Sequence, residues 1–325
     1  MSQTKVETLK TLLQHQHHYV SGQALCEKLG CSRTAIWKQI NELRKEGYTI
    51  DSVQNKGYKL IAMPSKLIKE MIDMILKTDC FGRHLTYYDT ISSTQKIAHH
   101  LAEDGAVEGT LVIADEQTGG RGRLGRAWHS PKGTGVWMSC ILRPTLDMER
   151  IPQLTLVAAV AIVRAIKQVS GVRCGIKWPN DILYDGKKLV GILTELQAEV
   201  GSVQAVIIGM GINVNSDAES IPDELRSIAT SLKIISGEAQ SREHLIAAIM
   251  LEFEMLYRMY LEEGFSVIKQ LWESHALSIG QPIRARLVDG KVLCGTALGI
   301  NDEGVLLIKD DQEMIHHIYS ADITM

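Results

Sequence analysis

The stretch ILYDGKKLVGILTELQ, residues 182–197, decides the fold class. Its two β-prone runs, Ile182–Tyr184 and Leu189–Gln197, flank Asp185-Gly186, a dipeptide typical of a two-residue hairpin turn. Because a hairpin joins antiparallel neighbours, the sheet that contains these strands is at least partly antiparallel. This pattern favours an α+β fold over a doubly wound parallel sheet.

The chain on both sides of the hairpin alternates strands with fewer helices. Further strands are expected at Leu85–Tyr88, Thr110–Asp115, Gly135–Leu142, Cys174–Trp178 and Val203–Ile208. Helices are expected at Lys66–Lys77, Ser93–Glu103, Leu154–Val169, Pro222–Ile235, Arg242–Glu263 and Ser266–His275. Since Pro64-Ser65 interrupts the pattern, we place a domain boundary near residue 64 and assign residues 64–276 to a central mixed-sheet domain.

Residues 277–325 contain short β-prone runs separated by turn residues. The runs are Pro282–Leu287, Lys291–Ile300, Gly304–Lys309 and Met314–Tyr319. Asp289-Gly290 is one of the turns between them. The pattern predicts a small region of short β-strands at the C-terminal end.

Residues 1–63 are expected to form three helices and a hairpin. A first helix is expected around the apolar residues at 6, 9, 12 and 13, and two more helices are expected at Gly22–Leu29 and Arg33–Glu46. Strands are expected at Tyr48–Val53 and Tyr58–Ala62. Ser21 and Ser32 can cap the second and third helices, and Gly30 can end the second. The short turn between them is typical of a helix-turn-helix.

The third helix has an apolar face and a polar face on opposite sides. With the basic hairpin that follows, the module resembles the winged helix-turn-helix family, whose third helix enters the DNA major groove. The DNA contacts that we predict are Arg33, Thr34 and Lys38 on the helix and Lys56 in the hairpin. Trp37 lies beside the apolar face, where packing is a more common role than base contact.

Charge divides the chain in the same place. Residues 1–63 hold nine Lys/Arg and five Asp/Glu, a balance of +4, whereas the remainder carries −7. This predicts a polyanionic partner for the module alone. The longest apolar run, Leu154–Val163, is shorter than the ~20 residues that span a bilayer, and the first 15 residues lack a signal-peptide stretch. We therefore expect a cytoplasmic protein with no membrane partner.

The loop QTGGRGRLGRAWHSPKGTG, residues 117–135, is long, glycine-rich and basic. Gly-x-Gly-x-x-Gly at 120–125 matches the dinucleotide fingerprint in form, but Pro131 and more glycines follow where that motif requires a helix. No Gly-Lys-Ser/Thr completes a P-loop either. Free backbone N–H groups and three arginines suit a loop that folds over an anionic ligand. The alternative is a basic linker, against which Trp128 argues, because an aromatic side chain in a loop usually packs or stacks.

Three polar clusters follow expected strands. They are Lys177–Asp181, Lys187-Lys188 and Gly209–Asn215. Each alone is ordinary turn chemistry. Together with the arginine loop they supply cations, amides and a carboxylate, which bind and polarise phosphates and carboxylates but provide no nucleophile. The sequence has no Gly-x-Ser-x-Gly elbow, no His-x-x-x-His pair and no Cys-x-x-Cys, so hydrolase and zinc-enzyme functions lack support.

In order and spacing, these motifs resemble those of the biotin protein ligases. The matching segments are Ser92–Gln95, Gly119–Trp128, Lys177–Asp181, Lys188–Ile192 and Gly209–Asn213. With the winged module in front, the whole chain resembles the bifunctional bacterial members, which combine a biotin ligase with a repressor of the biotin operon. The resemblance implies a central domain related to class II aminoacyl-tRNA synthetases and an SH3-like C-terminal barrel at 277–325.

The resemblance also implies the reaction and its residues. Biotin and ATP give biotinyl-5′-adenylate and pyrophosphate, with Mg²⁺ as cofactor, and a lysine of biotin carboxyl carrier protein then receives the biotin. Lys188 and Arg123 would be the catalytic residues, at the carboxylate and the α-phosphate. The implied biotin-binding residues are Ser93, Thr94, Gln117, Gly120, Arg121, Arg123, Lys188 and Gly191. The implied ATP-binding residues are Arg123, Arg126, Trp128, Asn180, Asp181, Lys188 and Asn213.

The resemblance treats two further positions, Asp181 and Gln95, separately. Asp181 would help either Mg²⁺ or the lysine nucleophile, and the metal ligands stay open. Gln95 is left out of the biotin site because family members often have asparagine there.

The resemblance finally implies a switch, in which biotinyl-5′-adenylate favours a homodimer whose paired winged modules bind operator DNA. Two other functions stay open: a biotin-sensing regulator without ligase activity, and a lipoate or octanoate ligase. Lys188 and Arg123 argue against the first, and the Arg-Gly-Arg loop argues against the second. A ligase whose winged module no longer binds DNA is a further alternative.

Overall fold

The computed structural model describes residues 3–15, 18–62, 66–199 and 202–325. Internal contacts divide the chain into two compact units, Met1–Met74 and Ile75–Met325. The domain boundary predicted near residue 64 falls at residues 63–65, which lie outside the described residues.

The first unit has the predicted three helices and hairpin. They are α1 (Gln3–Gln14), α2 (Gly22–Leu29), α3 (Arg33–Lys45), β1 (Thr49–Val53) and β2 (Gly57–Ala62). The Ser21 hydroxyl accepts from the Ala24 N–H at 3.0 Å, and the Ser32 hydroxyl accepts from the Ala35 N–H at 3.2 Å. Gly30 ends α2 in the left-handed conformation. The predicted caps are therefore confirmed, and they explain why the bounds of α2 and the start of α3 agree with the sequence.

The core of this unit is formed by side chains from the apolar faces of its helices, which pack together. Ile36, Ile40 and Leu43, which make up the apolar face of α3, are all buried. Helix α4 (Lys69–Ile75) is shorter than the Lys66–Lys77 that the sequence predicts, and its Met71 joins the same core together with Ile68. Ile68 and α4 thus pack with the helices that precede them.

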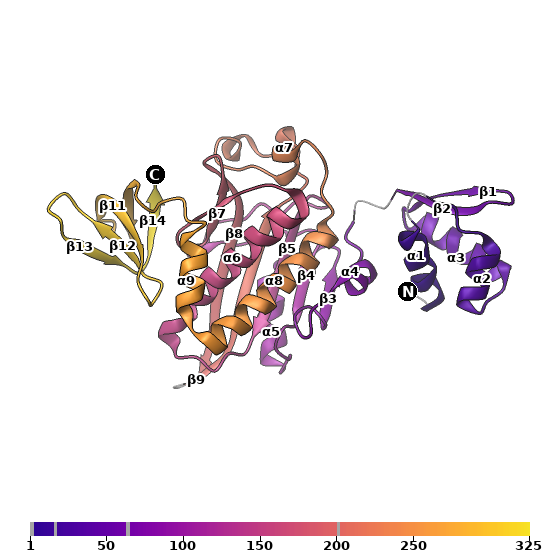
Figure 1. Cartoon of the computed structure of the whole chain (residues 1–325), viewed down its shortest axis with the longest axis horizontal. Coiled ribbons are helices and arrows are strands. Elements are labelled where there is room, and N and C mark those ends of the chain that lie inside the picture. The colour runs from indigo at the N-terminus through magenta and orange to yellow at the C-terminus, as the bar shows by residue number, and fades with distance from the viewer. Residues whose placement is uncertain (1–2, 16–17, 63–65, 200–201) are drawn as a thin grey trace. The chain divides into compact units, whose positions relative to one another are not determined.

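The second unit is built on a seven-stranded sheet (Figure 1). Its strands are β3 (Leu85–Tyr88), β4 (Leu111–Ala114), β5 (Gly135–Leu142), β6 (Gly175–Lys177), β7 (Asp181–Tyr184), β8 (Lys187–Glu199) and β9 (Ser202–Asn213). In the order β3-β4-β5-β9-β8-β7-β6, β3 and β4 are parallel and the other neighbours are antiparallel. Asp185 and Gly186, at φ 47° and 73°, form the predicted hairpin turn. The mixed sheet and the α+β class are confirmed.

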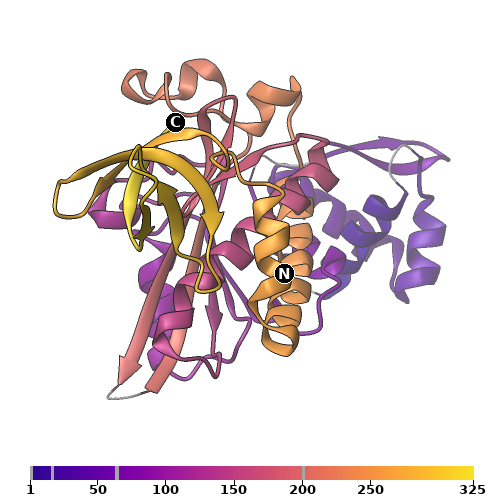
Figure 2. The same cartoon turned by 60° about the vertical axis from the view of Figure 1, so that its left-hand side comes forward.

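Helices cover both faces of this sheet (Figures 1 and 2). They are α5 (Thr94–Glu103), α6 (Ile151–Ser170), α8 (Arg242–Glu263) and α9 (Phe265–Glu273). The last three pack together on one face. On the other face α5 lies over β4, β5 and β9, where Ile141, Ala205 and Ile207 are buried beneath it. Alternate residues of β9 therefore point toward α5, which matters for the site described below.

Helix α6 contains the apolar run Leu154–Val163, whose short length predicted that no segment spans a membrane. By length and composition alone, the helical stretch Met148–Ser170 is apolar enough to cross a bilayer. However, 67% of its most apolar window is buried inside the protein, where α6 packs against α8, α9 and the sheet. It is the central core helix of the second unit.

The helix predicted at Pro222–Ile235 is wrong. The segment instead has a 3₁₀ turn at Asp223–Leu225 and a short helix α7 at Leu232–Ser236. Between them the backbone pairs with the start of β8: the Lys188 N–H donates to the Ile228 carbonyl at 2.7 Å, and the Thr230 N–H donates to the Lys188 carbonyl at 3.0 Å. This pairing breaks the expected helix at Ala229, between a turn at 226–228 and the start of α7, and the sequence periodicity does not reveal it.

The C-terminal part forms the predicted small antiparallel β structure (Figure 2). Its strands are β10 (Pro282–Leu287), β11 (Val292–Ile300), β12 (Leu306–Lys309), β13 (Ile315–Ile318) and β14 (Ala321–Thr324), in the order β13-β12-β11-β10-β14. The sequence did not predict β14, a four-residue strand with a weak β pattern.

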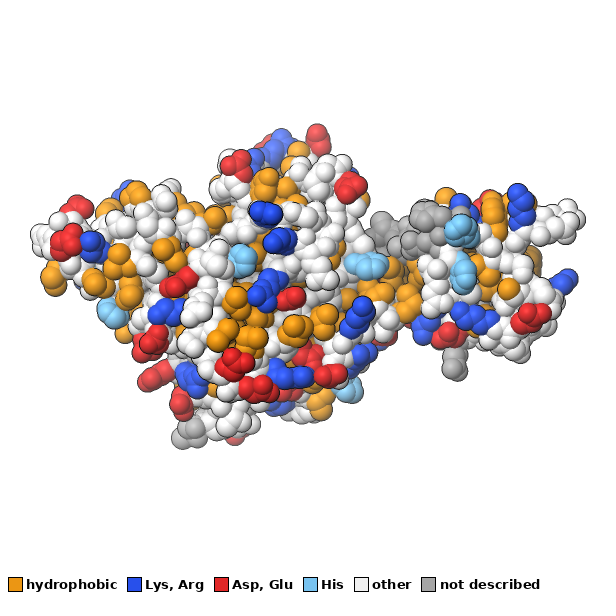
Figure 3. Space-filling model, in the orientation of Figure 1, with side chains coloured by type: hydrophobic (Ala, Val, Ile, Leu, Met, Phe, Trp, Pro, Cys, Tyr) orange, Lys and Arg blue, Asp and Glu red, His pale blue; other side chains and the backbone are white. Residues whose placement is uncertain are grey.

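On the face of the second unit that carries α8 and α9, acidic and basic side chains are interspersed (Figure 3).

Candidate functional site

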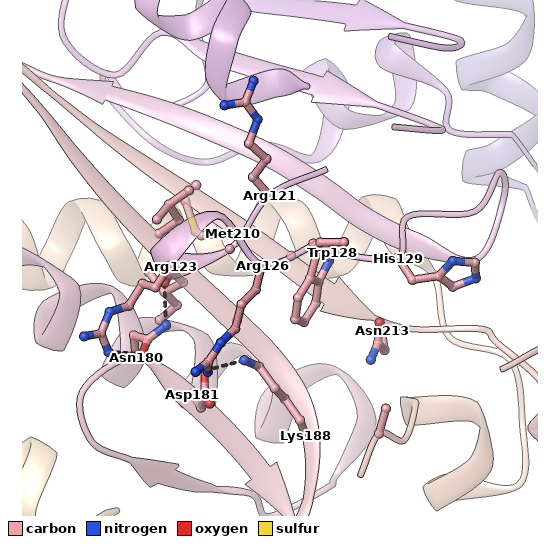
Figure 4. Close-up of a pocket in the computed structure, with 18 of the residues that line it drawn as sticks. Arg121, Arg123, Arg126, Trp128, His129, Asn180, Asp181, Lys188, Met210 and Asn213 are labelled. Atoms are coloured by element: carbon pink, nitrogen blue, oxygen red, sulfur yellow. Dashed lines mark hydrogen bonds and ion pairs between the residues drawn. The ribbon is translucent and has the colours of Figure 1, made fainter. Parts of the chain in front are cut away.

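A cavity of about 520 Å³ opens between the start of α5, the arginine loop and strands β7 to β9 (Figure 4). Every residue that the sequence assigned to biotin or ATP lines this cavity, except Gly120. The fold therefore brings together side chains that extend from Ser93 to Asn213 along the chain.

Trp128 lies across two glycines on neighbouring strands. Gly191 of β8 and Gly211 of β9 are direct partners in the sheet. A Cβ atom at Gly191 would lie 2.9 Å from the indole ring, and one at Gly211 would lie 2.4 Å from its Nε1. Because any larger side chain would displace the indole, this glycine pair sets the position of Trp128.

Lys188 is held beside that indole ring (Figure 4). Its Nζ lies 2.6 Å from Oδ1 of Asp181 and 5.3 Å from the centre of the Trp128 ring. Lys188 belongs to the start of β8 and Asp181 to the start of β7, so the predicted hairpin brings the two charges together. The site thus presents an ammonium group that is oriented by a carboxylate and an aromatic face.

The arginine loop is closed by contacts with the C-terminal strands. Arg123 donates one hydrogen bond to Oδ1 of Asn180 at 3.0 Å and another to the Ser320 hydroxyl at 2.8 Å. Arg126 forms an ion pair with Asp322. This pair raises the pKa of Arg126 and lowers the pKa of Asp322, whereas burial lowers the pKa of Arg123. Since a guanidinium stays charged in proteins, both arginines remain cationic at the cavity.

The opposite end of the cavity is neutral and hydrogen-bonded. Oε1 of Gln117 accepts from the Thr94 N–H at 2.8 Å, and the Thr94 and Ser139 hydroxyls lie 2.9 Å apart. Ser139 donates to Oε1 of Gln95 at 2.9 Å, and Gln117 donates to the Ser130 hydroxyl at 3.0 Å. Thr94, Gln95, Gln117 and Ser139 form the polar floor of the cavity, and Ser130 supports Gln117 from outside the lining. Such a floor suits an uncharged ligand group with donors and acceptors.

Gln95 belongs to this floor, although the sequence analysis left it out. Its Nε2 donates to the Ile207 carbonyl of β9 at 3.2 Å, and a Cβ atom at Gly209 would lie 2.6 Å from its Oε1. Gly209 and Gly211 point to the same face of β9. The alternating glycines of Gly209-Met210-Gly211 were the available signal that two side chains cross the strand there.

Several predicted residues have other surroundings. Gly120 lies outside the cavity lining, and a Cβ atom there would be 2.6 Å from the Trp128 carbonyl oxygen, so it permits the loop backbone to close. Arg121 is exposed and points away from Lys188 and Asp181 (Figure 4). Ser93 is buried at the start of α5 and caps it without a side-chain hydrogen bond.

The sequence missed Asp322 and Ser320. Asp322 also lines the cavity. Both residues lie beyond the last predicted strand, and only the packing of β14 against the rest of the second unit reveals that they reach the arginine loop.

The first unit presents a second candidate site. The four predicted DNA contacts, Arg33, Thr34, Lys38 and Lys56, are all exposed. Trp37, for which packing was the more common role, is 58% exposed. The α3 surface therefore offers basic, polar and aromatic side chains together.

Comparisons with protein families match all three regions. Residues 87–213 match the biotin/lipoate A/B protein ligase family, residues 6–59 match an HTH domain, and residues 278–325 match the biotin protein ligase C-terminal domain. The HTH match covers the winged module, the ligase match covers most of the cavity lining, and the C-terminal match covers the C-terminal strands.

Individual relatives extend over the whole chain. The chain is 54% identical to the bifunctional ligase/repressor BirA of Bacillus subtilis over 324 residues, which cover 100% of this chain and 99% of the relative. It is 29% identical to the protein of the same name from Escherichia coli, over 90% of this chain and 88% of that one. The biotin protein ligase of Aquifex aeolicus, solved with biotin and ATP, has a TM-score of 0.65 and 30% identity and covers 74% of this chain and 98% of its own.

Proposed function

The chain belongs to the family of bifunctional biotin protein ligases and repressors, and from this we propose that it biotinylates a carrier protein with ATP and represses transcription in response to biotin. The observation that carries the ligase function is the meeting of Lys188, Arg123 and Arg126 at one end of a cavity whose other end is a neutral polar floor. Biotin has this division, because its carboxylate lies at one end and an uncharged ureido ring at the other.

The first step would join two anions. A carboxylate oxygen of biotin attacks the α-phosphorus of ATP, the bond from that phosphorus to the bridging oxygen breaks, and pyrophosphate leaves. Lys188 and Arg123 would offset the charge that builds up between the reactants and hold them in line, which are the main ways in which a site without a nucleophile can accelerate such a step.

The second step would use the mixed anhydride that results. The uncharged ε-amine of a lysine on biotin carboxyl carrier protein attacks the acyl carbon, AMP leaves, and the new amide nitrogen loses a proton. Asp181, at the start of β7, is placed to accept that proton once the ligand draws Lys188 away. Trp128 would pack against the adenylate and limit the entry of water.

The remaining site residues follow from this arrangement. Ser93, Thr94, Gln117 and the backbone near Gly120 and Gly191 would border biotin, with Arg121 at the entrance of its pocket. On the ATP side we place Arg126, Trp128, Asn180, Asp181 and Asn213.

Mg²⁺ fits the donors that are present. Among the described residues no cluster of three or more His, Cys, Asp or Glu side chains could hold a metal by itself. Mg²⁺ commonly binds through one or two carboxylates together with substrate phosphates. Asp181 would supply the carboxylate, and the ion would neutralise phosphate charge when ATP binds.

The repressor function would reside in residues 1–63, the ligase in residues 64–276 and further ATP contacts in residues 277–325. Biotinyl-5′-adenylate would favour a homodimer, and the paired α3 helices would then bind a two-fold operator near genes of biotin synthesis or uptake. Arg33, Thr34 and Lys38 would contact the groove, with Lys56 at phosphate. We place the protein in the cytoplasm, where ATP, carrier protein and DNA are all available.

The ligase proposal is tested by biotin-dependent pyrophosphate release from ATP and Mg²⁺. Lys188→Ala should lower kcat/KM by ~100-fold or more, which corresponds to ~2.7 kcal/mol of transition-state stabilisation. Lys187→Ala is the matched control, because Lys187 is the exposed neighbour and lies outside the cavity lining. Release that does not depend on biotin would contradict the proposal. Release that lipoate supports as well as biotin would favour the lipoate ligase alternative instead.

The switch is tested by titrating operator DNA with and without biotin plus ATP. Tighter binding in the presence of both is expected. Equal affinity in the two conditions would exclude biotinyl-5′-adenylate as corepressor, and an unchanged sedimentation coefficient would exclude the ligand-dependent dimer.

A further inference from the structure

The aromatic side chain of α3, Trp37, lies largely outside the core of the first unit. Trp37 is 58% exposed, whereas Ile36 and Ile40 on the same helix are buried. Among the described residues of this unit, Ile61 is the other large apolar side chain with comparable exposure. Trp37 makes no hydrogen bond or ring contact with the described part of the chain. Most of its surface is therefore open to solvent and available to a partner.

Two polar residues on the same stripe of α3 as Trp37 contact other side chains of the unit. Arg33 and Asn41 lie one helical turn before and after it, on the same stripe of α3. Arg33 donates to Oε1 of Gln23 at 2.9 Å, and Oδ1 of Asn41 lies 3.4 Å from Nη1 of Arg44. These contacts fix the sides of the stripe and orient the helix surface around Trp37.

Charge identifies the partner of this surface. Lys38, next to Trp37, is exposed and forms no hydrogen bond or ion pair with the rest of the described chain. Lys45 is also exposed near the end of α3, and residues 1–63 carry +4 overall. An aromatic side chain within a basic helix surface fits a polyanion that also presents apolar groups. The major groove of duplex DNA does so, because the C5-methyl groups of thymines line it among phosphates.

We propose that Trp37 is a specificity-determining residue of the operator complex, where it packs against a thymine C5-methyl group in the major groove. This inference rests on the proposed repressor function. Since the indole is uncharged, it releases no counterions and contributes to sequence discrimination. Lys56 at phosphate, and the positive charge of Lys38 within the groove, would contribute affinity for any duplex.

The first experiment separates these contributions. A duplex is selected from a random pool by the wild-type protein with biotin and ATP, and a scrambled duplex of the same composition serves as reference. Trp37→Ala should weaken binding to the selected duplex by roughly 10-fold, change binding to the scrambled duplex little, and leave the salt dependence unaltered. Lys38→Ala should weaken both and lower the salt slope by about 1. Ile61→Ala is the matched exposed apolar control and should behave as wild type.

The second experiment locates the contact. Each thymine of the selected duplex is replaced in turn by deoxyuridine, which removes only the methyl group. Replacement at one position in each half-site should weaken wild-type binding by several-fold. The same replacement should not weaken binding by Trp37→Ala any further. Trp37→Phe should retain part of the discrimination, because a smaller ring still reaches the methyl group.

Three results for Trp37→Ala would overturn the inference. The first is wild-type affinity for the selected duplex, and the second is an equal loss of affinity for the selected and the scrambled duplex. A loss of dimerisation by Trp37→Ala without DNA, seen by sedimentation, would show a protein contact instead. If the wild-type protein itself selects no sequence, the repressor function fails together with this inference; if it selects one and Trp37→Ala reads it equally well, this inference alone fails.

Discussion

The two tryptophans at the functional surfaces, Trp37 and Trp128, have opposite surroundings. Trp37 projects from α3, a helix whose cap, turn and apolar face are all local in sequence. Trp128 lies across Gly191 and Gly211, which belong to two strands far from it along the chain. A surface for a large partner can thus be presented by one helix, whereas a cavity for a small ligand must be assembled from distant segments. The cavity should therefore depend on remote anchors that the DNA surface does not need.

The strongest such anchor is Arg242 at the start of α8. Its Nη1 donates to Oδ1 of Asp115 at 2.8 Å and to the Gly135 carbonyl at 3.0 Å, so it ties together the two ends of the arginine loop. The side chains of this ion pair are 4% and 1% exposed. Because Arg242→Ala leaves a buried carboxylate without its guanidinium, we expect the second unit to lose about 3–5 kcal/mol of unfolding free energy.

Denaturant titration followed by two probes measures this effect. Circular dichroism of the whole chain should show that the second unit unfolds at a lower denaturant concentration. A single fluorescent label on α1 should show an unchanged midpoint for the first unit. Arg164→Ala is the control, since Arg164 pairs with Glu252 at 3.5 Å on a partly exposed face and should cost below 1 kcal/mol. A parallel loss in both units would contradict the contrast between them.

The glycine pair beneath Trp128 offers the next largest effect. Gly211→Val would place a branched side chain where even a Cβ atom lies 2.4 Å from the indole. The ring must move, and Lys188 loses the aromatic face beside it. We expect kcat/KM for biotin-dependent pyrophosphate release to fall by about 100-fold, as is typical when a reacting group is misplaced by about 1 Å.

The same variant should leave DNA recognition intact in the absence of ligand. Binding of the scrambled duplex, which measures the first unit alone, should match wild type. Gly22→Ala is the matched glycine substitution in the first unit. Its Cβ atom would meet only Tyr58, at 3.9 Å, so neither the fold of that unit nor ligase activity should change. If Gly211→Val kept wild-type activity, the position of Trp128 would not matter for catalysis.

The same contrast explains what could be predicted from the sequence. The helices of the first unit were predicted closely because Ser21, Ser32 and Gly30 are local signals that act within one turn. The arginine loop and Lys188 were found because their residue types are themselves unusual at that spacing. The chemistry of the cavity was therefore visible before its geometry.

Contacts that depend on tertiary structure were not predictable. The pairing of Gly191 with Gly211 depends on the register of β8 and β9, and the role of Gln95 depends on α5 crossing β9 above Gly209. The break in the helix expected at 222–235 is fixed by backbone hydrogen bonds to Lys188. In each case the partner lies far away in sequence, where no periodicity or cap reports it.

The smallest effect is expected at the contact between the arginine loop and β14. Arg126 and Asp322 have side chains that are 64% and 44% exposed, so solvent screening limits their pair to at most about 1 kcal/mol. Asp322→Asn should loosen the loop without unfolding the unit. Trypsin cleavage at the loop arginines of the ligand-free protein should rise by about threefold, and biotin with ATP should suppress it. Asp289→Asn, at an exposed turn, is the control.

The pH dependence of this pair has a definite sign. Because Arg126 lowers the pKa of Asp322 below its ordinary value of 3.8, the carboxylate form is favoured in the folded protein. Its contribution to stability is complete above that ordinary value and is lost as the pH falls through the lowered one. The difference in unfolding free energy between wild type and Asp322→Asn should hence be constant from about pH 8 to 5, and should shrink only in stronger acid. A difference that already changes near neutral pH would mean that another group, and not this carboxylate, holds the arginine loop against the C-terminal strands.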